Sequence, residues 1–102
     1  MAGLDAGTPS TAAWPTLARG LAGAIVIDDD EADRAARDLA ALGIEAGESG
    51  AAGLAGLRAL IEDATCAALR PARLREALVV VTEGATDPER YAEVISNPRV
   101  DL

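Results

Sequence analysis

The stretch LVVVTEGATDP, residues 78–88, determines the fold class that this sequence predicts. It opens with a leucine and three valines, which is the composition of a short buried strand. Thr82 follows the strand, Gly84 permits a turn, and Asp87 with Pro88 begins a helix, because proline suits the first turn of a helix. Ligands of α/β proteins bind at the carboxyl ends of the strands, so Thr82 is a candidate binding residue.

A second apolar run at residues 24–27 predicts another buried strand. Asp28 and Glu31 have the spacing of a capping box, and small apolar residues recur at helical spacing over residues 32–40. Gly43 is a suitable left-handed end for this helix. We therefore expect an α/β fold in which helices pack on a few mostly parallel strands.

The next predicted helix begins near Ser49, which we interpret as its N-cap. Gly50, Gly53 and Gly56 recur every three residues and therefore lie close to one face of this helix. Each interior glycine costs about 1 kcal/mol relative to alanine, so the stripe indicates a close approach by another part of the structure. Tight packing against a neighbouring helix or strand and proximity to a ligand both explain the stripe.

The composition offers little material for a core. The 102 residues include 24 alanines, one Trp and one Tyr, but no Phe. Alanine favours helix but buries little apolar area. Two short strands also do not make a self-sufficient parallel sheet. We therefore expect residues 1–102 to form a single segment of a larger unit, with neighbouring strands supplied from elsewhere.

The net charge of −8 and the lack of a basic cluster argue against nucleic acid and anionic membrane surfaces as partners. No apolar run approaches the roughly 18 residues of a membrane-spanning helix. The single cysteine, Cys66, cannot form an internal disulfide and is typical of a cytoplasmic protein. The acidic run at residues 28–31 lacks the pattern of a calcium loop and suits the first turn of a solvated helix.

Two segments carry a resemblance to a known family. The sequences GESGAAGLAGL, residues 47–57, and TEGATDPE, residues 82–89, closely resemble the C-terminal region of diaminopropionate ammonia-lyases. These enzymes depend on pyridoxal 5'-phosphate and have the tryptophan-synthase-β-like fold, called fold type II. The resemblance implies that this chain is the C-terminal portion of such a catalytic domain.

The resemblance also implies a set of cofactor-binding residues. Thr82 stands where the family places a neutral hydroxyl against the pyridine nitrogen. Glu48 matches an acid that lines the ring, and Ser49 with Gly50 begins the helix behind it. Gly3 lies in a segment that resembles a loop near the cofactor. From the residues alone, Thr82 suits a turn cap and Glu48 suits stabilisation of the helix dipole.

All nine basic residues are arginines, and this chain therefore lacks the Schiff-base lysine that the family requires. The resemblance places that lysine, the glycine-rich phosphate cup and the acid-base aspartates upstream of Met1. We expect no catalytic residue in this chain and no activity from it alone. A gene fragment, a split subunit and a mis-assigned start remain open.

The complete enzyme implied by the resemblance is a cytoplasmic homodimer of amino-acid catabolism that converts 2,3-diaminopropionate to pyruvate and ammonia. Its partners are the amino-acid substrate and the missing N-terminal part. A threonine synthase or dehydratase relative is an alternative enzyme. A non-catalytic acidic interaction or dimerisation module is an alternative of another class, in which the glycine stripe is a packing face.

Overall fold

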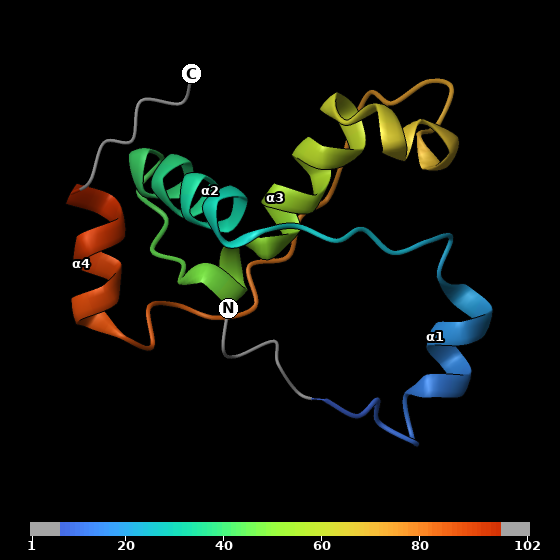
Figure 1. Cartoon of the computed structure of the whole chain (residues 1–102), viewed down its shortest axis with the longest axis horizontal. Helices are drawn as coiled ribbons and strands as arrows, with labels where there is room; N and C mark the ends of the chain where they lie inside the picture. The colour runs from blue at the N-terminus through green and yellow to red at the C-terminus, as the bar shows by residue number, and fades with distance from the viewer. Residues whose placement is uncertain (1–6, 97–102) are drawn as a thin grey trace.

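The computed structural model describes residues 7–96, and this part of the chain contains helices but no β-strand (Figure 1). The elements are α1 (Trp14–Gly20), α2 (Asp29–Ala41), α3 (Glu48–Glu62), the 3-10 helix η2 (Ala64–Leu69) and α4 (Pro88–Ser96). Helix α2 lies between α3 and α4, whereas α1 lies apart from them at the end of the molecule opposite α4.

Helix α2 has the boundaries that its capping residues predict. Asp28 has an extended backbone, and its Oδ1 accepts a hydrogen bond from the backbone N–H of Glu31 at 2.8 Å. This contact satisfies one of the free donors of the first helical turn. Gly43 has a φ of 80°, so the predicted left-handed residue after the helix is confirmed.

Helix α3 begins earlier than the sequence predicts, because Glu48 is already its first residue. Its N-cap is Gly47, which offers no side-chain hydrogen bond, and Ser49 already lies in the first turn. The assignment of Ser49 as N-cap is therefore wrong. Asp63 ends α3 and caps η2, because its Oδ1 accepts hydrogen bonds from both the backbone N–H and the hydroxyl of Thr65.

The core lies between α2 and α3 and continues to α4. Arg58 of α3 also pairs with Asp38 of α2 at the surface of this contact. The core is made almost entirely of small side chains, because the helical spacing that buries one face of α2 and α3 places alanine there. Its buried members are Ala35, Ala36, Leu39, Ala46, Ala51, Ala55 and Val94.

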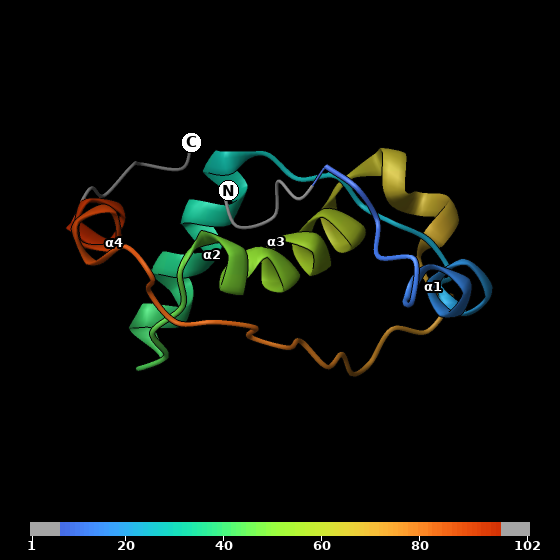
Figure 2. The same ribbon diagram turned by 90° about the horizontal axis from the view of Figure 1, so that it is seen from below.

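The predicted α/β fold is contradicted by the helical structure. Residues 24–27 and 78–81, the two predicted strands, are neither helix nor strand, and neither segment forms a backbone hydrogen bond with any residue in the range 7–96. A strand requires a neighbouring strand to satisfy its N–H and C=O groups. Figure 2 shows the two segments on opposite sides of α3, so they cannot pair with each other. Val26 and Leu78 are consequently 94% and 92% exposed.

Candidate functional site

The two segments that carry the family resemblance meet at the N-terminal end of α3. The Thr82 hydroxyl donates a hydrogen bond to the backbone carbonyl of Ser49, with an oxygen–oxygen distance of 3.5 Å across 33 positions of sequence. Beside it, the backbone of Glu83 crosses Gly50 so closely that a Cβ on Gly50 would lie 2.1 Å from the Glu83 carbonyl oxygen. Only glycine fits there, since no Cβ approaches a carbonyl oxygen at that distance.

The glycine stripe of α3 therefore packs against an extended segment of the same chain. A Cβ on Gly53 would lie 3.1 Å from Cγ1 of Val79, whereas a Cβ on Gly56 would have no atom within 4 Å. Two of the three glycines serve close packing, which was one of the two explanations that the sequence left open.

A pocket of about 150 Å³ opens beside this contact, between the middle of α2, the start of α3, the turn at residues 83–87 and the start of α4. Four carboxylates and one guanidinium lie along its walls. The charged lining residues are Asp33, Glu48, Glu83, Asp87 and Arg90. Because acids outnumber the single base, the pocket disfavours an anionic group such as a phosphate.

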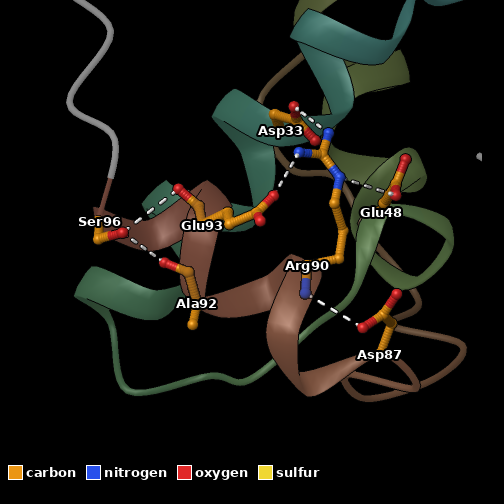
Figure 3. A network of polar contacts seen from close by, with 7 residues as sticks. All are labelled: Asp33, Glu48, Asp87, Arg90, Ala92, Glu93 and Ser96. Atoms are coloured by element: carbon orange, nitrogen blue, oxygen red, sulfur yellow. Dashed lines mark hydrogen bonds and ion pairs between the residues drawn. The ribbon is translucent and has the colours of Figure 1, made fainter.

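Arg90 is the centre of the polar contacts at the pocket, and Figure 3 shows its side chain reaching from α4 toward α2 and α3. Its Nη2 lies 3.0 Å from Oδ2 of Asp33, and its Nε lies 3.6 Å from Oε1 of Glu48. A longer pair joins its Nη1 to Oε2 of Glu93 at 3.9 Å. The charge of Asp33 is the main cause that raises the pKa of Arg90 above its ordinary value.

The start of α4 explains why Arg90 reaches this position. Asp87 precedes the helix, and its Oδ1 accepts a hydrogen bond from the backbone N–H of Arg90 at 3.1 Å (Figure 3). Pro88 occupies the first turn of α4, where its missing N–H has no cost. These local contacts orient α4 so that Arg90 points toward the acids of the neighbouring helices.

Four of the five predicted site residues lie together. Thr82, Glu48, Ser49 and Gly50 share the N-terminal end of α3, while Gly3 lies outside the described residues. The sequence analysis missed Arg90, because no motif distinguishes it from the other arginines. The only sequence signal that could have identified Arg90 is its position three residues after the capping residue Asp87.

Pyridoxal 5'-phosphate, the cofactor that the resemblance implies, needs a partner for its ring nitrogen, a site for its phosphate and an amine for its aldehyde. Thr82 is an exposed neutral hydroxyl, as the ring nitrogen requires, and its bond to Ser49 is long enough to exchange easily. The acidic pocket does not suit the phosphate, and the chain has no lysine to bind the aldehyde. Of these three needs, the described residues offer a group for the first alone, the Thr82 hydroxyl, which is not among the residues that line the pocket.

Residues 7–96 contain no group of three or more side chains that could hold a metal ion. In the same range, no helix is long and apolar enough to cross a membrane. No protein-family model matches the chain, no curated protein matches its sequence, and no solved structure matches its fold.

Proposed function

We propose that this chain supplies the ring-binding C-terminal part of a pyridoxal-phosphate-dependent ammonia-lyase. The complete enzyme eliminates ammonia from 2,3-diaminopropionate and yields pyruvate. The observation that carries the proposal is the contact between the two resembling segments, where Thr82 meets Ser49 and Glu83 crosses Gly50. Segments that share a cofactor must lie together, and these two are far apart in the sequence.

Each residue has a specific task in this proposal. Thr82 would hold the cofactor at its ring nitrogen through the hydroxyl that here donates to the Ser49 carbonyl. A hydroxyl does not hold that nitrogen protonated, as an aspartate would, and this tempers the electron-withdrawing power of the ring. Glu48 would supply an acid beside the cofactor ring, and its ion pair with Arg90 at 3.6 Å keeps the carboxylate in place. Gly50 lets the chain at Glu83 approach α3 closely.

The cofactor itself, when bound, stabilises the negative charge that forms when the substrate loses its α-proton. The lysine that binds the cofactor belongs to a further, N-terminal part of the enzyme. Exposed apolar side chains at Trp14 and Val26 suit a contact with that part. We place the complete homodimer in the cytoplasm, where a lone cysteine stays reduced.

The test uses this chain fused to the N-terminal part of a diaminopropionate ammonia-lyase. Thr82→Val keeps the side-chain shape but removes the hydroxyl, which leaves a ring nitrogen without its hydrogen bond at a cost of about 1 to 3 kcal/mol. Cofactor affinity or turnover should fall by about one to two powers of ten. Thr82→Ser is the matched control, because it keeps the oxygen and should retain most of the activity.

A fusion that lacks activity and cofactor absorbance, or a valine variant that equals its parent in affinity and rate, would refute the assignment. A second measurement uses the chain alone with pyridoxal phosphate and borohydride. We expect no adduct on an internal residue, since the α-amine of Met1 is the only amine present. A trapped internal adduct would contradict the proposal that the lysine comes from another part.

The second candidate function is the non-catalytic interaction or dimerisation module. The observation that favours it is the exposed apolar row on residues 78–81, where Leu78 and Val80 are 92% and 65% exposed. The glycine stripe is not the free face of such a module, because Gly50 and Gly53 already contact residues 79–83.

A further inference from the structure

We draw no further inference here: the strongest candidate, the acidic pocket of about 150 Å³ between α2, the start of α3 and the start of α4, belongs to the candidate site already described, and no second feature of residues 7–96 indicates which ligand would enter it.

Discussion

Two glycines of α3 differ sharply in their surroundings, although the sequence presents them as equivalent. Gly50 lies under the Glu83 carbonyl oxygen, whereas Gly56 faces open space. Gly50→Ala must push the backbone of residues 82–84 away, and overpacking of this kind costs about 1 to 3 kcal/mol. Gly56→Ala removes only the entropic cost of glycine and should stabilise α3 by about 0.5 to 1 kcal/mol. Urea titration followed by far-UV circular dichroism compares the two.

The pair of variants is its own control, because both place the same methyl group on the same helix. If Gly50→Ala raised the helix content as Gly56→Ala does, residues 82–84 would not lie against α3. The contact on which the candidate site depends would then be absent.

Arg90 joins three helices, so its removal should act on all of them. Asp33 is only 14% exposed, and its Oδ1 is already buried without a hydrogen-bond partner among residues 7–96. Arg90→Met keeps the apolar stem of the side chain but leaves the Asp33 carboxylate without its counter-ion. Loss of a partner for such a group costs about 1 to 3 kcal/mol, and the 41% exposure of Arg90 favours the lower end through solvent screening. Amide hydrogen exchange along α4 measures the loosening.

Glu93→Gln provides the comparison for Arg90. The Glu93 side chain is 74% exposed, and its pair with Arg90 spans 3.9 Å. Surface pairs of this kind contribute about 0 to 1 kcal/mol, so exchange rates in α4 should change little. Equal effects of Arg90→Met and Glu93→Gln would mean that the part-buried pair with Asp33 does not hold α4.

At the scale of elements, the helices could be predicted from sequence and the strands could not. Asp28 and Gly43 bound α2, and Pro88 begins α4, because capping depends on contacts within a few residues. A strand depends on a partner that sequence periodicity does not reveal. Residues 24–27 and 78–81 have strand composition, yet no described segment lies beside either one to complete a ladder.

The capping of η2 by Asp63 should make the stability of this helix depend on pH. The pKa of Asp63 is lowered from its ordinary 3.8, first by the hydrogen bond from the Thr65 backbone and then by the Thr65 hydroxyl. The pKa of Asp63 is therefore lower in the folded chain than in the unfolded chain, and the ionised carboxylate stabilises η2 at pH values above the unfolded pKa. This stabilisation is lost as the pH falls through the folded pKa. η2 should therefore loosen only below about pH 4.

Carbon-13 NMR of the Asp63 carboxyl group measures its titration midpoint. Thr65→Val removes the hydroxyl bond but keeps the larger backbone bond, so the midpoint should rise part of the way toward 3.8. A parent midpoint at or above 3.8 would show that Asp63 does not cap η2.

At the scale of the whole molecule, the candidate site was predictable in part. Thr82, Glu48 and Gly50 were identified by their resemblance to a family, and the fold brings them together. The link between α4 and the other helices could not be foreseen, because it depends on the side chain of Arg90 crossing to Asp33. Long-range ion pairs of this kind follow from the packing of helices and leave no pattern in the sequence.

The core of the molecule sets its overall stability. Leu39 and Val94 are the largest members of a cluster that otherwise consists of alanines, and no large side chain in the described range is fully buried. Each buried methylene stabilises the folded state by about 0.8 kcal/mol, and an alanine can bury only its methyl group. Fixing the backbone of each residue on folding costs about 1 to 2 kcal/mol in conformational entropy. The monomer should therefore show helical circular dichroism and a broad thermal transition. A cooperative melt of the monomer above about 65 °C, the upper end for ordinary small domains, would show that these alanine contacts suffice for an independent fold.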